Sequence, residues 1–228
     1  MNSHKFVLLN SSHLQSVTEF LHKNFFKRGL EPLASMLSDP EDEYTDTIDQ
    51  IKLGCSDYIK SGHSWGIFNE NSEILGVSLN TIRVAPLGPS FSEMVMGSFW
   101  SCARYCNSEA YYWDVEIQLL KDLGSYSCYK NLENGTKVIF IQILSISDKC
   151  RRQGIGYKLV DHVLSVEKAD FSVVQTTNSK SFGLFRKMGY SVDNQIEYES
   201  YRDSRGKLPF KGRLVNGEQK LSLLSKKL

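Results

Sequence analysis

The chain has almost no net charge, no long apolar run and few cysteines, and each of these absences excludes a class of protein. The net charge is +1 across 228 residues, so no overall field favours nucleic acid or a membrane surface. No apolar run approaches the roughly 20 residues that cross a bilayer. We therefore expect neither nucleic acid nor a membrane as a partner.

The cysteines and histidines also lack the spacing of a structural site. The five cysteines are odd in number and scattered. With no signal peptide in evidence, they indicate a reducing compartment rather than a disulfide framework, and we expect a cytoplasmic protein. Cys102 and Cys106 stand four residues apart, but no nearby pair of cysteines or histidines completes a zinc set. The five histidines show no ligand spacing, so no metal site is expected.

The most informative stretch lies past the middle of the chain. A β-branched apolar run from Val138 to Ser147 leads into Arg151-Arg-Gln-Gly-Ile-Gly156, and an amphipathic stretch follows from Tyr157 to Ala169. This order predicts a strand, a tight turn and a helix N-terminus. The first N–H groups of a helix have no intrahelical partner, and together with the helix dipole they attract anions. We expect a phosphate-bearing cofactor here; the alternative is an ordinary turn with solvated arginines.

The spacing of the glycines excludes two common phosphate loops. A P-loop needs Gly-Lys followed by Ser or Thr, whereas Gly156 is followed by Tyr157-Lys158-Leu159. The dinucleotide fingerprint needs a third glycine at the position of Leu159. The stretch does match Arg/Gln-x-x-Gly-x-Gly/Ala. In this it resembles the pyrophosphate loop of the GNAT acetyltransferase superfamily, which binds acetyl-CoA.

Apolar periodicity and turn residues predict the remaining elements. Strands are expected over residues 5–9, 65–68, 74–84, 171–176, 197–202 and 220–225, and helices over 14–25, 40–61, 179–187 and most of 90–123. The segment Ser12-His-Leu-Gln15 resembles a capping box for the first helix. Strands and helices alternate around the loop without a repeat or a linker. We therefore expect a single α/β domain over residues 1–228.

Two further segments extend the resemblance over most of the chain, with residues 86–135 the least recognisable. Thr176-Thr-Asn-Ser-Lys-Ser181 followed by Leu184-Phe-Arg-Lys-Met-Gly-Tyr190 is similar to the next GNAT block. Phe25-Phe26 followed by Glu31-Pro-Leu33 resembles one branch, the insect-type arylalkylamine N-acetyltransferases. The family fold implied is a mixed central sheet flanked by helices and splayed at the acetyl-CoA site. We expect the sheet to splay after residue 146.

The resemblance also implies which residues bind the cofactor. The strand before the loop would hydrogen-bond the pantetheine arm through its backbone, and the loop would hold the pyrophosphate. The cofactor-binding residues expected on this basis are Leu144, Ser145, Ile146, Arg151, Arg152, Gln153, Gly154, Ile155, Gly156 and Asn178.

Acetyl transfer to an amine also needs a base and an acid. Alkylamines are mostly protonated at neutral pH, so a general base must remove a proton. By resemblance the base is Glu31; on the residues alone, a surface glutamate at a helix end is the alternative. Thr177 and Ser181 stand where the branch usually carries two serines, and either could give a proton to the departing thiolate. Both could instead cap the helix over 179–187.

The expected activity is therefore acetyl transfer from acetyl-CoA to a small arylalkylamine such as dopamine, tyramine, octopamine or serotonin. The 12 Phe, 11 Tyr and 3 Trp residues suit an aromatic amine, although aromatic residues are more often found in cores. One alternative keeps the enzyme but takes a polyamine or agmatine-like amine, or a longer acyl donor. The other is a CoA-binding regulatory module without catalysis. We expect a monomer.

Overall fold

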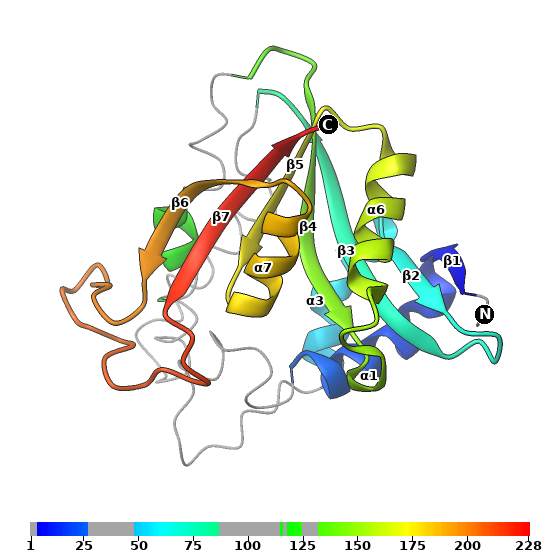
Figure 1. The fold of residues 1–228 in the computed structure, drawn as a ribbon, viewed down its shortest axis with the longest axis horizontal. Helices are drawn as coiled ribbons and strands as arrows, with labels where there is room; N and C mark the ends of the chain where they lie inside the picture. The colour runs from blue at the N-terminus through cyan, green and yellow to red at the C-terminus, as the bar shows by residue number, and fades with distance from the viewer. Residues whose placement is uncertain (1–3, 27–47, 87–114, 116–117, 125–131) are drawn as a thin grey trace.

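A seven-stranded mixed sheet forms the centre of the molecule (Figure 1). The structure is a computed structural model and describes residues 4–26, 48–86, 115, 118–124 and 132–228. The strands are β1 Lys5–Leu8, β2 Trp65–Phe68, β3 Ile74–Val84, β4 Lys137–Ile146, β5 Phe171–Thr176, β6 Ser191–Glu197 and β7 Lys220–Lys227. They lie in the order β1-β2-β3-β4-β5-β7-β6. Only β4 and β5 pair in parallel among these neighbours.

Helices cover both faces of this sheet. One face carries α6 (Ile155–Glu167) and α7 (Ser179–Lys187), which lie in front of the strands in Figure 1. The other face carries α1 (Leu14–Asn24), α3 (Ile48–Lys60) and the helical residues 118–123. Two 3₁₀ turns complete the described elements, η1 (Ser11–His13) and η3 (Asp148–Cys150). The expected single α/β domain with a mixed sheet is confirmed in these residues.

Strand β4 is anchored on both faces of the sheet. Val138 and Phe140 pack into one cluster with the 198–214 segment, while Ile139 and Ile141 pack beneath α6 and α7 on the other face. This double burial accounts for the continuous apolar run from Val138 to Ile141. Each fully buried aliphatic side chain contributes about 1.5–3 kcal/mol. The strand is therefore a firm support for the turn that follows it.

A β-bulge interrupts β4 where the sheet opens. On β3, Leu79 pairs with Ile143 and Asn80 pairs with Ile141, so Gln142 is an extra residue without a partner in this register. A bulge bends its strand and increases the local twist. The parallel pairing of β4 with β5 also stops at Ile141 and Val174, and the two strands diverge below that point in Figure 1. The sheet therefore splays after Ile141, earlier than the expected residue 146.

Two other expectations need correction. The N-cap that begins the first helical segment is Asn10, whose side chain accepts from the Ser12 N–H, rather than Ser12 itself. The strand expected over 197–202 is wrong, because β6 ends at Glu197 and residues 198–200 form a turn. Strand β6 lies at the sheet edge with most of its side chains exposed. Its sequence therefore lacks the apolar alternation that would have revealed it.

The other predicted elements agree with the structure to within a few residues. The helix predicted over 40–61 is confirmed as α3, which begins at Ile48, and Gly62 follows it with a φ of 77°. A left-handed residue after a helix is a common C-terminal cap, and glycine adopts it without strain. The rest of that prediction, residues 40–47, and the helix expected in 90–114 lie outside the described residues.

Candidate active site

The turn between β4 and α6 is built on two left-handed residues. After η3, Arg152 has a φ of 62° and Gly154 a φ of 75°. Gln153 spans the turn, because its Nε2 donates to the Lys149 carbonyl oxygen at 3.1 Å. Left-handed residues in a turn direct successive backbone N–H groups toward one side, which creates a concave site for anions.

The N-terminus of α6 opens directly onto this turn. Gly154 is the N-cap, and no side chain caps the helix. The first intrahelical bond runs from Lys158 N to Gly154 O at 3.0 Å, which leaves the N–H groups of Ile155, Gly156 and Tyr157 without an intrahelical acceptor. A Cβ added at Gly154 would meet no protein atom within 4 Å. The turn therefore has both the donors and the open space that a pyrophosphate requires.

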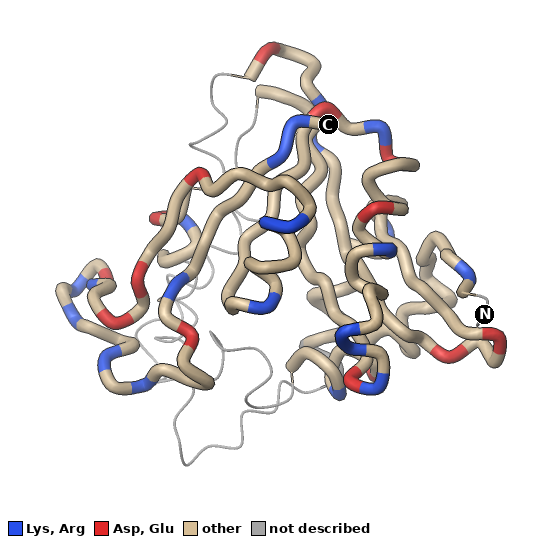
Figure 2. The backbone as a smooth tube through the Cα atoms, viewed as in Figure 1, with Lys and Arg blue, Asp and Glu red and all other residues tan. Residues whose placement is uncertain are grey.

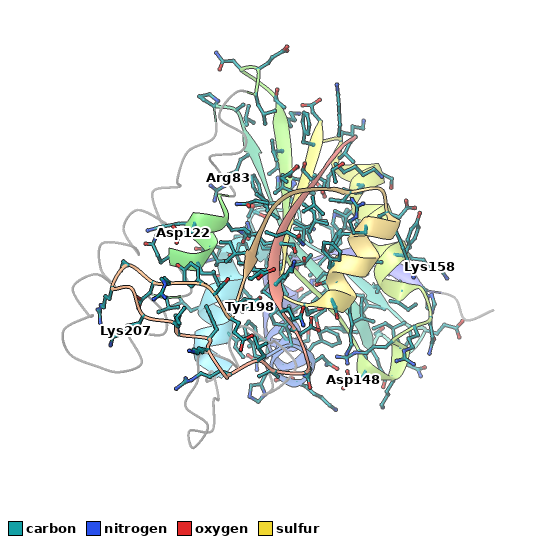
Figure 3. All side chains as sticks on the ribbon, turned by 60° about the vertical axis from the view of Figure 1, so that its left-hand side comes forward. Arg83, Asp122, Asp148, Lys158, Tyr198 and Lys207 are labelled. Carbon is teal, nitrogen blue, oxygen red and sulfur yellow. The ribbon has the colours of Figure 1, made fainter. Side chains whose placement is uncertain are left out.

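Charged residues gather at the same turn, as Figure 2 shows. The Arg151 guanidinium lies 2.6 Å from the Asp148 carboxylate, which Figure 3 labels at this end of the sheet. Both side chains are largely exposed, so the pair adds little stability. An incoming phosphate can therefore compete for Arg151 at small cost. Arg152 is exposed beside it.

The last residues of β4 are positioned by close packing. The Ile146 side chain lies between two glycines. A Cβ on Gly76 would come within 2.5 Å of Ile146 Cδ1, and one on Gly156 would lie 3.5 Å from Ile146 Cγ1 and 3.3 Å from Leu184 Cδ2. The absence of a side chain at Gly156 therefore lets α6 approach the sheet closely.

The neighbouring residues of β4 point to opposite faces of the sheet. Leu144 packs beneath α6 and α7. Ser145 is buried on the other face, where its hydroxyl makes a long contact of 3.5 Å to the Asn24 carbonyl. Asn24 is the last residue of α1, and its side chain accepts from Asp148 N at 3.4 Å. On the β5 side, the described strands offer no pairing partner to β4 beyond Ile141. The backbone there is available to a ligand such as pantetheine.

The segment between β5 and α7 forms the second wall of the site. Asn178 is the N-cap of α7, and its Oδ1 accepts from Ser181 N at 2.8 Å. The Ser181 hydroxyl lies 3.1 Å from both the carbonyl and the side-chain oxygen of Asn178. Ser181 therefore takes part in the N-terminal cap of α7 that Asn178 forms. Thr177 is half-buried, and its carbonyl accepts from the Tyr198 hydroxyl at 3.1 Å.

The parallel pairing of β4 and β5 brings these two segments together. The carboxyl ends of adjacent parallel strands meet at one edge of a sheet, where ligands of α/β proteins commonly bind. Residues 151–156 follow β4, and residues 177–181 follow β5. The close approach of Gly156 to Leu184 of α7 confirms that the two helices are adjacent. Glu31, the expected base, lies outside the described residues.

Two buried residues of this region were missed in the sequence. Tyr198 and Glu218 come from the segment between β6 and β7, and both contact the turn before α7. No local pattern marks Glu218, which is 39 residues from its partner Ser179. Burial raises the pKa of the Tyr190 hydroxyl to about 12, and this hydroxyl shares a hydrogen bond of 2.6 Å with the Ser172 hydroxyl.

Within the described ranges, no three His, Cys, Asp or Glu side chains gather as a potential metal site. No helix in the part of the chain that the structure describes is long and apolar enough to span a membrane.

Comparisons with known proteins agree with this geometry. Residues 89–190 match the acetyltransferase (GNAT) family. Arylalkylamine N-acetyltransferase 2 from Aedes aegypti superposes with a TM-score of 0.79 at 19% identity, over 99% of both chains. The polyamine N-acetyltransferase of Drosophila melanogaster, which forms N-acetylagmatine, gives a TM-score of 0.75 at 15% identity, over 99% of this chain and 100% of that one. At such identities the two structures show a shared fold. No curated protein sequence matches the chain.

Proposed function

Because residues 89–190 match the acetyltransferase (GNAT) family and the fold resembles that of an arylalkylamine N-acetyltransferase, we propose that the chain moves the acetyl group of acetyl-CoA to the primary amine of a small arylalkylamine. Two neighbouring features carry the proposal. One is the part of β4 that no longer pairs with β5, and the other is the N-terminus of α6, which no side chain caps. Strand β4 leaves β5 after Ile141, and the left-handed turn at Arg152 and Gly154 follows at its end. These two features suit the pantetheine and the pyrophosphate of one cofactor.

Each part of the cofactor has a matching part of the protein. The backbone of Leu144, Ser145 and Ile146 would hydrogen-bond the pantetheine arm in the place of a neighbouring strand. The pyrophosphate would accept from the first N–H groups of α6, with Arg151 and Arg152 adding positive charge. Asn178 would contact the cofactor from the opposite wall. Acetyl-CoA supplies the activated acetyl thioester, and the chain's own groups orient it.

The reaction forms a C–N bond and breaks a C–S bond. We propose that Glu31, alone or through water, takes a proton from the ammonium so that the neutral amine nitrogen can attack the thioester carbon. The backbone N–H near Ile146 would stabilise the negative charge that develops on the carbonyl oxygen. Ser181 or Thr177 would pass its hydroxyl proton to the thiolate that leaves and recover a proton from solvent, to which Glu31 releases the proton that it took. Since the Ser181 hydroxyl donates to Asn178 in the structure, it must rotate to do so.

The aromatic pair at the end of α1 supports an aromatic acceptor. Phe25 and Phe26 lie edge to face with centroids 5.0 Å apart, and both are half-buried. They follow Asn24, which contacts the end of β4, and they pack against the core beneath α1 and α3, so they lie near the end of this strand. Aromatic rings bind an aromatic amine by stacking and a cationic amine through their π-faces.

A polyamine or agmatine acceptor is the second candidate, and the likeness to the Drosophila polyamine N-acetyltransferase favours it. Such a cation would need free carboxylates. Glu31 is assigned to the base. Among the residues that the structure describes, two further carboxylates belong to the segments that border the site, and both are engaged. Asp148 pairs with Arg151, and Glu218 binds Ser179. This favours the arylalkylamine.

The proposal is tested with a panel of amines and acetyl-CoA, with release of the CoA thiol as the measured signal. One comparison sets five arylalkylamines against agmatine, spermidine and a lysine peptide; the arylalkylamines are phenethylamine, tyramine, dopamine, octopamine and serotonin. A second comparison tests acetyl-CoA against longer acyl-CoA donors with the best amine. We expect the highest kcat/KM for an arylalkylamine with acetyl-CoA. A much higher value for agmatine or spermidine would establish the second candidate. Cofactor binding without amine-dependent thiol release would indicate a CoA-binding module.

A further inference from the structure

The turn that carries Thr177 and Ser181 is held from outside by the segment between β6 and β7. The Tyr198 hydroxyl donates to the Thr177 carbonyl at 3.1 Å. The Glu218 carboxylate accepts from Ser179 twice, from the backbone N–H at 2.6 Å and from the hydroxyl at 3.0 Å. These contacts span most of the turn from the end of β5 to the first residues of α7.

Both residues lie at the base of this segment, where it is tied to the sheet. Tyr198 follows β6 directly, and its N–H donates to the carbonyl of Gln219 at 2.9 Å. Glu218 donates its N–H to Val215 and stands just before β7. The Tyr198 ring is fully buried against Phe210, at 5.3 Å between centroids. The two groups that hold the turn are therefore themselves held rigidly.

Glu218 is a buried carboxylate whose oxygens are both hydrogen-bonded. Only 7% of its surface is exposed, and a buried carboxylate is costly unless it is hydrogen-bonded or paired. Both oxygens of Glu218 have a donor, and the positive end of α7 lies beside them. The helix already has a conventional N-cap in Asn178. The carboxylate adds a rigid connection between this turn and the far edge of the sheet.

We propose that Glu218, assisted by Tyr198, is a positioning residue that holds the hydroxyls of Thr177 and Ser181 in line for proton donation to the leaving thiolate. The proposal rests on the proposed function. Glu218 fixes the position of Ser179. The neighbouring Asn178 in turn holds Ser181, because its Oδ1 accepts from the Ser181 N–H at 2.8 Å. Tyr198 fixes Thr177 on the other side of the cap. Neither residue is expected to touch substrate.

The chain offers a matched control for each residue. Asp203 lies in the same segment with 8% exposure, and its Oδ1 accepts from the N–H groups of Arg205 and Lys207. It caps a turn as Glu218 does, but away from α7. Tyr201 packs in the same cluster as Tyr198 and donates its hydroxyl to Asp122 at 2.8 Å.

The test compares Glu218→Ala with Asp203→Ala, and Tyr198→Phe with Tyr201→Phe, in single-turnover and steady-state assays with the best amine. A misplacement of about 1 Å can reduce a rate by roughly 100-fold. We expect Glu218→Ala to lower kcat about 10- to 100-fold and Tyr198→Phe about 3- to 10-fold. The KM for acetyl-CoA should stay within about threefold. The control variants should keep kcat within about threefold of wild type.

Rescue by an isosteric variant separates positioning from general stability. Glu218→Gln keeps an acceptor for the Ser179 N–H, so we expect it to restore most of the lost kcat. Equal losses in Glu218→Ala and Asp203→Ala would overturn the proposal. So would a Glu218→Ala effect confined to the KM for acetyl-CoA. If Glu218→Ala did not fold, the kcat of Tyr198→Phe would be compared with that of Tyr201→Phe. Equal losses of kcat in these two variants would overturn the proposal.

Amide hydrogen exchange tests the positioning of the turn without relying on enzyme activity. If wild type transfers acetyl to no amine, the proposed function fails while the contacts remain. In that case, exchange at residues 179–182 is compared in Glu218→Ala and Asp203→Ala. Faster exchange there in Glu218→Ala alone would support the positioning of the turn. Unchanged exchange would overturn it.

Discussion

At the scale of single residues, the turn between β4 and α6 contains two glycines, and each is required for a different structural reason. Gly154 has a φ of 75° and open space where a side chain would stand. A residue with a Cβ pays about 1–2 kcal/mol in this conformation, and its side chain would occupy the space of a phosphate. Gly156 has no positive φ; its missing side chain lets α6 approach Ile146 and Leu184. The same pattern of glycines thus combines a conformational need with a packing need.

The charge of the group bound at Gly154 can be tested with two substitutions that are isosteric with each other. Asn and Asp both tolerate the left-handed region, so Gly154→Asn and Gly154→Asp strain the backbone similarly. Only the aspartate repels a pyrophosphate. We expect calorimetry to show acetyl-CoA binding at least about tenfold weaker in Gly154→Asp than in Gly154→Asn, with the difference reduced by salt. Gly212→Asp, at a φ of 71° with open space, serves as the control and should bind like wild type. Equal affinities in the two Gly154 variants would argue against an anion at this turn.

Glu31 is tested by a change that keeps its shape. Glu31→Gln can form similar hydrogen bonds but cannot accept the amine proton. A general base contributes about 100- to 10,000-fold, or roughly 3–5 kcal/mol of barrier, so we expect kcat/KM at pH 7 to fall by that factor. The loss should shrink at high pH, where more of the amine is already neutral, and acetyl-CoA affinity should hardly change. Glu19→Gln on α1 is the control. A Glu31→Gln enzyme within about threefold of wild type would remove Glu31 from the mechanism.

At the scale of elements, α6 has two ends with separate roles. Its N-terminus faces the turn, while its last turns attach it to β1 and β2. The His162 ring stacks on Phe6 with centroids 4.1 Å apart and meets Trp65 edge to face at 4.7 Å. Glu167 accepts from Trp65 Nε1 and from His63 Nδ1, both at 2.6 Å. These contacts hold the helix axis, so that the N–H groups at its other end keep their direction.

The attachment of α6 should weaken in acid. Burial among aromatic rings lowers the pKa of His162 below 6.5, opposed in part by Asp161 and Glu167. The folded state therefore favours the neutral ring, and the unfolded state takes up the proton first as pH falls. The contribution to stability is present above pH 6.5 and is lost as pH falls through the folded pKa. We expect urea unfolding between pH 7.5 and 5.5 to show a larger loss of stability in wild type than in His162→Phe. Parallel curves would contradict this.

At the scale of the whole molecule, one short stretch of pairing joins the two halves of the sheet. β4 and β5 pair only from Val138–Phe171 to Ile141–Val174. On one face, α1 and α3 pack over β3, whereas the 198–214 segment packs over β4, β5 and β7. A ligand that occupies the gap beyond Ile141 would contact both halves. Its binding should therefore stabilise the whole domain rather than one element.

This predicts a thermal shift with acetyl-CoA. A ligand at 100 times its Kd adds about 2.7 kcal/mol to the free energy of unfolding. In a protein of this size, each kcal/mol raises Tm by roughly 2–4 °C, so we expect a shift of about 5–10 °C by scanning fluorimetry. Gly154→Asp should need a higher concentration for the same shift. No shift at saturating acetyl-CoA would contradict the site.

The sequence by itself determined the strand, turn and helix from Lys137 to Glu167, together with β5 and α7. These elements are specified by neighbouring residues: an apolar run buried on both faces, glycines in the turn and an amphipathic repeat. The turn that would hold the cofactor could be predicted for the same reason, whereas the individual cofactor-binding residues follow from the family resemblance and stay predictions. β6 escaped prediction because an exposed edge strand carries no apolar alternation.

Tertiary structure alone decided the details that depend on distant partners. The bulge at Gln142 exists only in the register of β4 against β3, and it sets the opening at Ile141 rather than Ile146. The support of the α7 turn by Tyr198 and Glu218 joins segments far apart in the chain. Periodicity reports which face of an element is buried, but it does not report which residue from another element will meet it. For that reason the position of the site was readable from the sequence, while the residues that hold its second wall were not.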